Sequence, residues 1–377
     1  VPRASDVRPD AAGPAGARHR SGGGWVGSTG TEAAAGTTAA DDRRNVSDAT
    51  GIAVLAACAT WSLVTAAARG GRPEGVLLAV LAVSAGYASG RICGALLPVA
   101  TPCAGALAGL GLVLAAPHGT AGLQGSSPLG PAGATAALLT LCAGAACCAA
   151  WAARPSASRL ALRLLAAAIT VTAAALGSLT GFAACAGVLL CSSAADRMRR
   201  RGPGLACLAL GTALVSATAW AIAENVLPAG LTTALEGQLT ERRILLWRDA
   251  LRLARQDPVL GAGPGRFGEL SPTAAQSLLP DGKPHSAPLQ QAAEQGLLGV
   301  ALLAAVFCWV LYALWRSPRA TPIALTAGAS LTALAAIATV GDALSFTTVT
   351  AGAGLLAGIA TARPLLSGEA EGERGAD

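Results

Sequence analysis

Residues 239–299 read LTERRILLWRDALRLARQDPVLGAGPGRFGEL followed by SPTAAQSLLPDGKPHSAPLQQAAEQGLLG, and they form the only long polar segment between two apolar runs. The segment contains one of the three histidines of the chain and a dense group of arginines. Elsewhere the chain is apolar: 53% of its 377 residues are hydrophobic and 13% are charged, whereas about 25% of a soluble protein is charged. We therefore expect any chemistry to occur in the polar segment, with the apolar runs as its scaffold.

The apolar runs are long and poor in charge, which is typical of transmembrane helices. They predict an all-α integral membrane protein: a polytopic bundle of about ten transmembrane helices with one large extracytoplasmic loop that contains short helices. The expected spans cover residues 51–68, 75–90, 92–116, 131–152, 160–178, 180–195, 205–226, 297–315, 322–340 and 347–362. The expected domains are a disordered cytoplasmic N-terminal segment (1–48), transmembrane helices one to seven (49–226), the motif loop (227–296), helices eight to ten (297–362) and a disordered cytoplasmic tail (363–377).

Three short basic loops, at residues 154–159, 196–201 and 316–319, fall on the same side of the bundle under this count. Positive charge in short loops is retained in the cytoplasm. The count therefore predicts a multi-pass protein of the cell membrane whose motif loop faces outward. One loop disagrees, because Arg69 and Arg72 would then lie on the outer side.

The ten cysteines, from Cys58 to Cys308, all lie inside apolar runs. Small buried side chains are a better interpretation of this placement than disulfides or a zinc site, since no cysteine pair has the spacing of metal ligands. We expect no metal site, no cofactor and no nucleic-acid partner.

The first part of the motif loop predicts a helix from about Glu241 to Gln256, with Thr240 as its N-cap. Asp257 followed by Pro258 ends it, because the residue before a proline disfavours the helical region.

Arg243, Trp247 and Leu251 would share one face of this helix, since residues four apart are neighbours. Arg242 would point elsewhere, nearer Asp249. An equally weighted interpretation is an amphipathic helix that lies on the bilayer with Trp247 at the interface.

The sequence GAGPG at 261–265 follows, and we call it the glycine turn. It lacks the lysine and hydroxyl residue of a nucleotide-binding loop. A tight turn that reverses the chain is the better interpretation.

His285 lies just before a second expected helix, for which Ser286 is a candidate cap and Pro288 fits the first turn. Gln290 and Glu294 would share one face of that helix. A helix N-terminus attracts phosphate and disfavours a positive charge, so we expect a neutral imidazole that can accept a proton.

Three sub-motifs occur in order in this loop: R-x-x-x-W from Arg243, D-P-V-L-G-A-G-P-G-x-F at 257–267, and H-S-x-x-L-Q-x-x-x-E-x-G-L-L-G at 285–299. Together they resemble the O-antigen ligase/polymerase-like membrane family. The resemblance implies transfer of a glycan from a polyprenyl (undecaprenyl) diphosphate carrier to a hydroxyl of a glycan, lipid or protein acceptor, without metal or nucleotide.

The resemblance also implies roles for residues of the loop. Arg243 would hold the diphosphate and His285 would orient or deprotonate the acceptor hydroxyl, which are the two catalytic roles. Further residues that we expect at the substrate are Arg242, Trp247, Lys283, Gln290 and Glu294. Membrane lipid would surround the site.

One departure concerns a second family arginine near the outer end of an earlier span. The corresponding stretch here is SLTGFAAC at 178–185, which has no arginine; Arg242, Arg248 or Lys283 are candidate substitutes. Ser286 also replaces a frequent asparagine. The alternatives are therefore a catalytically weak or inactive relative in polysaccharide assembly, or a transporter of a lipid-linked solute. A transporter favours charges at mid-membrane, and Asp342 is expected at an interface instead.

Overall fold

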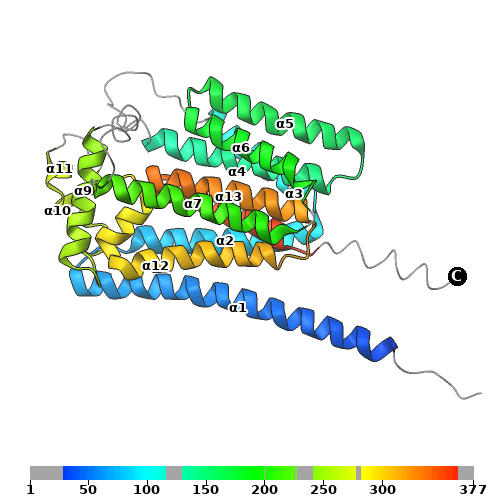
Figure 1. Ribbon diagram of the computed structural model, residues 1–377, viewed down its shortest axis with the longest axis horizontal. Helices are drawn as coiled ribbons and strands as arrows, with labels where there is room; N and C mark the ends of the chain where they lie inside the picture. Colours follow the sequence, from blue (N-terminus) through cyan, green and yellow to red (C-terminus); the bar gives the residue numbers. More distant parts are fainter. Residues whose placement is uncertain are drawn as a thin grey trace, which may run out of the picture. The chain divides into compact units, whose positions relative to one another are not determined.

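The computed structural model describes residues 29–115, 130–198, 200–224, 226, 241–276 and 282–363, and its regular structure is helical (Figure 1). Contacts divide the chain into residues 1–45 and residues 46–377, and the arrangement below concerns the second unit. Thr240, most of the predicted N-terminal segment and nearly all of the predicted C-terminal tail lie outside the described residues. The helices are α1 (Thr29–Arg69), α2 (Glu74–Leu96), α3 (Ala100–Ala115), α4 (Gly130–Ala152), α5 (Ser156–Ala175), α6 (Leu179–Ala195), α7 (Arg201–Ala223), α9 (Glu241–Gln256), α10 (Phe267–Leu270), α11 (Pro272–Ala275), α12 (Ala287–Trp315), α13 (Thr321–Val340), η1 (Ala343–Ser345) and α14 (Thr347–Thr361).

Seven of the described helices are long and apolar enough to cross a membrane: α1 from Ser47 onward, α2, α4, α5, α7, α12 and α13. Three more, α3, α6 and α14, are apolar but contain only 16, 17 and 15 residues. A span needs about 20 residues. Over the described residues the structure therefore confirms an all-helical fold with seven helices that can cross a membrane, and the count of ten spans stays a prediction.

Two predicted boundaries differ from the structure. The first helix begins at Thr29, within the predicted N-terminal segment 1–48. The second helix runs on to Leu96 instead of ending near residue 90. Its break lies at Leu97, which precedes Pro98 and adopts a non-helical conformation (φ −130°, ψ 72°), as a residue before proline prefers.

The centre of the bundle is formed by α4 and α13, most of whose residues are buried, whereas fewer than a third are buried in each of the other five long spans. Small side chains allow these two helices to approach closely. A Cβ added to Gly144 of α4 would lie 1.9 Å from the hydroxyl of Ser330 in α13. Large apolar side chains of the peripheral helices are exposed, among them Leu164 and Leu214, and lipid is the environment that suits them.

Helices α2 and α14 pack backbone against backbone. A Cβ on Gly90 would lie 2.3 Å from the carbonyl oxygen of Leu355, and one on Gly354 would lie 2.3 Å from that of Val83. Only glycine fits such backbone contacts. The glycine-rich sequence is therefore a packing requirement at this pair of helices.

The three basic loops lie together at one end of the bundle, opposite α9, α10 and α11 (Figure 1). Arg201 links two of them by donating to the carbonyl oxygens of Ser317 and Arg319, at 2.6 and 3.0 Å. The motif residues and the basic loops thus occupy opposite ends, as the topology prediction requires.

Candidate functional site

Helix α9 spans Glu241–Gln256, the bounds predicted for it. Arg243, Trp247 and Leu251 share one face and are all buried, with exposed fractions of 2%, 0% and 3%. The interpretation of a helix lying on the bilayer with Trp247 at the interface is therefore wrong. Instead the face packs into a small apolar core at this end of the bundle, which includes Ile222, Ile244, Phe267, Ala274 and Leu289.

Trp247 connects this helix to the turn that carries His285. Its indole N–H donates to the carbonyl oxygen of Pro284 at 2.9 Å. Arg243 lies one helical turn earlier on the same face, and His285 is the residue after Pro284. The structure thus brings the two predicted catalytic residues to the same buried region, where the exposed fraction of His285 is 5%.

His285 adopts a positive φ of 51°, which no other non-glycine residue does in the described part of the chain. A side chain in this region is uncommon and is retained where the surroundings hold it. Residues 283–286, which we call the His285 turn, are held from both sides. Trp247 binds Pro284 on one side, and Lys283 forms an ion pair with Asp342 at 3.4 Å on the other.

Asp342 contacts the His285 turn through Lys283, a contact that the sequence did not indicate. It lies between α13 and α14, its carboxylate also accepts a hydrogen bond from Ser345, and its side chain is only 12% exposed. The sequence placed it at an interface with no partner. The available signal was an acidic residue at the end of an apolar run, where charge is rare and is retained for pairing.

Helix α12 begins at Ala287 with Pro288 in its first turn, as predicted. Ser286 occupies the N-cap position, but its side chain makes no capping hydrogen bond, so the predicted hydroxyl cap is wrong. On the next turns, Gln290 donates to Glu294 at 3.5 Å. Glu294 is 5% exposed, and the backbone N–H groups of Gly265 and Phe267 face its carboxylate.

Gly296 breaks α12 with a non-helical conformation (φ 70°, ψ −169°), which we call the Gly296 kink. A break of this kind leaves carbonyl groups without helical partners. The carbonyl oxygens of Ala293 and Glu294 accept from the N–H groups of Ala262 and Gly263, at 2.8 and 2.9 Å. On the other side of the kink, the N–H of Leu297 donates to the carbonyl oxygen of Pro258 at 2.8 Å.

The second sub-motif is therefore a cap for the broken helix. The glycine turn, which provides the capping N–H groups, has positive φ at Gly261, Gly263 and Gly265. A Cβ on Gly261 would lie 2.6 Å from the carbonyl carbon of Glu294. Close backbone approach and a reversed chain direction account for this spacing of glycines.

The α1–α2 connection explains the loop that disagreed with the charge rule. Arg69 forms an ion pair with Asp257, and its carbonyl oxygen accepts from Arg266 at 2.7 Å. The N–H of Arg72 donates to the carbonyl oxygen of Pro264, also at 2.7 Å. Both arginines thus lie at the motif end because they contact the motif loop.

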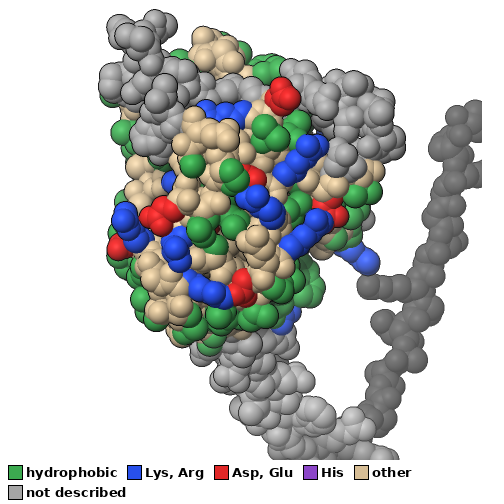
Figure 2. All heavy atoms as spheres, turned by 90° about the vertical axis from the view of Figure 1, so that its left-hand side faces the viewer, with side chains coloured by type: hydrophobic (Ala, Val, Ile, Leu, Met, Phe, Trp, Pro, Cys, Tyr) green, Lys and Arg blue, Asp and Glu red, His purple; other side chains and the backbone are tan. Residues whose placement is uncertain are grey.

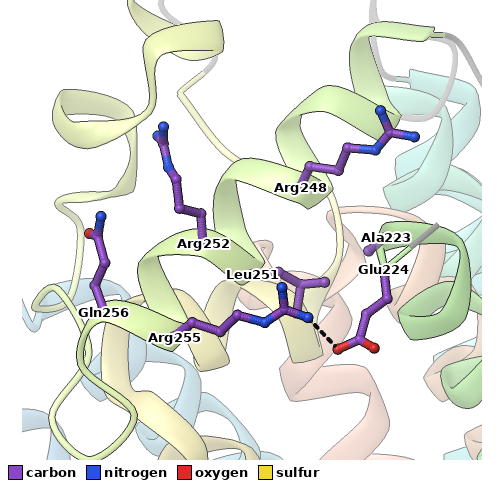
Figure 3. Close-up of a pocket in the computed structure, with 7 residues that line it drawn as sticks. All are labelled: Ala223, Glu224, Arg248, Leu251, Arg252, Arg255 and Gln256. Atoms are coloured by element: carbon purple, nitrogen blue, oxygen red, sulfur yellow. Dashed lines mark hydrogen bonds and ion pairs between the residues drawn. The ribbon is translucent and has the colours of Figure 1, made fainter. Parts of the chain in front are cut away.

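The outer face of α9 differs from the buried one. Arg242 is exposed on this face, as is Arg252, which pairs with Asp249 at 3.4 Å. A shallow pocket lies between the end of α7 and this face (Figure 3), and Arg255 binds Glu224 there at 2.8 Å. Arg248, one of the candidate substitutes for the second family arginine, lines the same pocket.

Acidic and basic side chains alternate over this end of the molecule (Figure 2). Lys283, another candidate substitute, is paired with Asp342. The stretch that lacks the family arginine starts α6: Ser178 caps the helix by accepting from the N–H of Gly181 at 3.1 Å. This start is satisfied locally, so the missing arginine leaves the fold of α6 intact.

Residues 132–304 match the model of the O-antigen ligase family, a range that runs from α4 into α12 and includes all three sub-motifs. The chain carries an O-antigen ligase domain. Searches of the curated proteins and of the solved structures give no significant match. The O-antigen ligase domain supports a glycan-transfer function of the ligase or polymerase type in polysaccharide biosynthesis, and the seven helices that can cross a membrane agree with a multi-pass membrane protein.

Proposed function

We propose that this O-antigen ligase domain transfers a glycan from a polyprenyl diphosphate, of the undecaprenyl type, to an acceptor hydroxyl on a glycan, lipid or protein. The observation that carries the proposal is the shared burial of Arg243 and His285 on either side of the hydrogen bond from Trp247 to Pro284. A permanent cation and a proton acceptor in one sheltered region match what this reaction requires.

Arg243 supplies the charge for the leaving group. The bond between the anomeric carbon and the diphosphate oxygen breaks, and the departing diphosphate carries the electron pair. A guanidinium binds such oxygens with two parallel hydrogen bonds. Burial lowers the pKa of Arg243, yet an arginine remains protonated at neutral pH, so the charge is present and poorly screened by water.

His285 supplies the proton acceptor. As the acceptor hydroxyl attacks the anomeric carbon, its proton passes to the imidazole, and the new glycosidic bond forms on the face opposite the diphosphate. A single displacement of this kind inverts the anomeric configuration. Lys283 lies in the His285 turn, and Gln290 and Glu294 lie on the helix that follows it. We assign all three to substrate orientation. Trp247 would hold the turn in place, and the exposed Arg242 would contact the more distant part of the substrate.

We place the motif end of the bundle on the extracytoplasmic side. The support is its position opposite the three basic loops, which cytoplasmic retention of positive charge would hold inside. This placement is tested with Glu269→Cys, at an exposed position of the motif end. Whole cells that contain this variant are treated with a membrane-impermeant reagent that reacts with cysteine, and we expect labelling of intact cells. Labelling only after membrane permeabilisation would reverse the assignment.

The transfer itself is tested with purified protein in detergent, a synthetic undecaprenyl-diphosphate disaccharide and a panel of glycan and lipid acceptors. We expect His285→Ala and Arg243→Ala to lower the rate of undecaprenyl diphosphate release by about 100-fold or more, the size that removal of a general base or charge donor has. Arg252→Ala is the matched control, because Arg252 is an exposed arginine of the same helix. Equal rates in wild type and both site variants would refute the assigned roles.

A catalytically inactive relative is the second candidate, and the absence of arginine from residues 178–185 favours it. In that case wild type would bind undecaprenyl diphosphate in native mass spectrometry but release none from the disaccharide donor. Introducing arginine at Phe182, which is 40% exposed near the start of α6, would then be the variant expected to gain activity.

A further inference from the structure

We propose that Trp61 of α1 is a positioning residue for the transfer, acting by holding the Gly296 kink. The inference rests on the proposed function and adds a residue outside the matched range 132–304. Trp61 lies in an apolar run, where its sequence gives no sign of a contact with the motif loop.

The Gly296 kink leaves three neighbouring carbonyl groups that need donors from elsewhere. The glycine turn supplies two of them, through Ala262 and Gly263. The third, on Gln295, accepts from the indole N–H of Trp61 at 3.0 Å. Gln295 is only 3% exposed, so water has poor access to this carbonyl, and loss of the indole donor would leave a buried acceptor unsatisfied.

The orientation of residues 287–295 depends on the hydrogen bonds at the Gly296 kink. That segment begins two residues after His285 and carries Glu294, so rotation about the kink moves both side chains relative to α9. Helix α1 is also fixed to the glycine turn by the ion pair between Arg69 and Asp257. The same helix therefore holds both sides of the cap, and Trp61 is its contact with the kink itself.

Trp309 provides a matched control. Its indole N–H donates to the carbonyl oxygen of Ser47 at 2.9 Å, which joins the same two helices, α1 and α12, by the same kind of bond. Ser47 and Trp309 lie away from the kink, on the span side of α12. Removing this bond weakens the helix pair without touching the His285 turn.

The experiment compares wild type, Trp61→Phe and Trp309→Phe as full-length proteins in detergent. Turnover is measured with the undecaprenyl-diphosphate disaccharide, and hydrogen exchange is followed for peptides covering residues 257–266 and 287–299. We expect Trp61→Phe to lower kcat roughly 10- to 100-fold with little change in KM, because small misplacements of catalytic groups have effects of this size. Its exchange should rise in both peptides, and Trp309→Phe should show neither change.

Two results would overturn the proposal: equal exchange of both peptides in the two variants, or an unchanged kcat in Trp61→Phe when wild type is active. If wild type transfers nothing, the proposed function fails, and the exchange comparison alone decides whether Trp61 holds the kink. The thermal midpoint of unfolding is measured for both variants. Equal midpoints would assign a difference in kcat to the site and not to global stability.

Discussion

Replacing Gly296 with alanine is the most direct test of the kink as the element that organises the motif loop. Gly296 has a φ of 70°, and an added Cβ would lie 2.3 Å from the carbonyl oxygen of Val259 and 2.7 Å from that of Pro258. The Pro258 carbonyl is the acceptor for the N–H of Leu297. The substitution therefore introduces backbone strain. It also displaces the segment at Pro258 and Val259, which contacts the broken helix.

The size of the effect follows from those contacts. A side chain at the conformation of Gly296 (φ 70°, ψ −169°), which is essentially reserved for glycine, costs about 1–3 kcal/mol. Moving the cap away breaks at least two buried hydrogen bonds, each worth about 1 kcal/mol and more when an acceptor stays unsatisfied. The local free energy of opening should therefore fall by about 3–5 kcal/mol.

Gly177 is the control, because it has nearly the same φ of 72° but nothing within 4 Å of an added Cβ. Gly177→Ala should lose only the strain of about 1–2 kcal/mol. Hydrogen exchange in the amides that follow each glycine reports the local free energy of opening, and turnover is measured on the same preparations. Equal losses in the two variants, or full activity in Gly296→Ala, would refute the idea that the capped kink positions the site.

Three further outcomes are expected. Gly90→Ala should lower the thermal midpoint of unfolding in detergent by several degrees, whereas Gly211→Ala, which has open space around its Cβ, should not; similar midpoints would show that α2 and α14 can separate without cost. Trp247→Phe should reduce turnover strongly, because it leaves the Pro284 carbonyl buried without its donor; turnover near the wild-type rate would mean that this bond does not hold the His285 turn. Burial alone would raise the pKa of Asp249, but hydrogen bonds from the start of α11 hold it lower. The hydrogen bonds from Ser271 and Thr273 to the Asp249 carboxylate therefore stabilise the loop above about pH 4. This stabilisation is lost as the pH falls through the lowered pKa of Asp249. Proteolysis of the loop should accordingly increase in acid, and Asp249→Asn should remove that pH dependence.

The sequence was sufficient for elements whose cause is local. The apolar runs identified every helix of the bundle, and Asp257 with Pro258 set the end of α9 at the residue observed. The buried face of α9 was predicted from spacing, but its partner was not. A pattern of Arg, Trp and Leu four residues apart is the same for a helix on a bilayer and a helix in a core.

Contacts between segments that are distant in sequence could not be predicted from the spacing of residues within one segment. Trp61 and Asp342 both come from outside the motif loop, and each binds one residue of it across more than fifty positions of sequence. The same holds for Arg69, whose charge looked misplaced until its partner Asp257 was known. Residues of this kind become interpretable only when the fold shows which helix ends meet.

The three sub-motifs form one connected unit, and the residues proposed to bind substrate are carried on it. The first supplies the buried strut of Trp247, the second caps the broken helix, and the third contains both the His285 turn and the kink. Because the stretch at 178–185 belongs to none of these contacts, the loss of arginine there changes the charge near the site and leaves the unit intact. Whether the protein is active therefore depends on whether the remaining cations at the motif end balance the negative charge of the diphosphate. Restoring arginine at Phe182 separates these cases, since a gain in turnover without a change in hydrogen exchange would assign the deficit to charge alone.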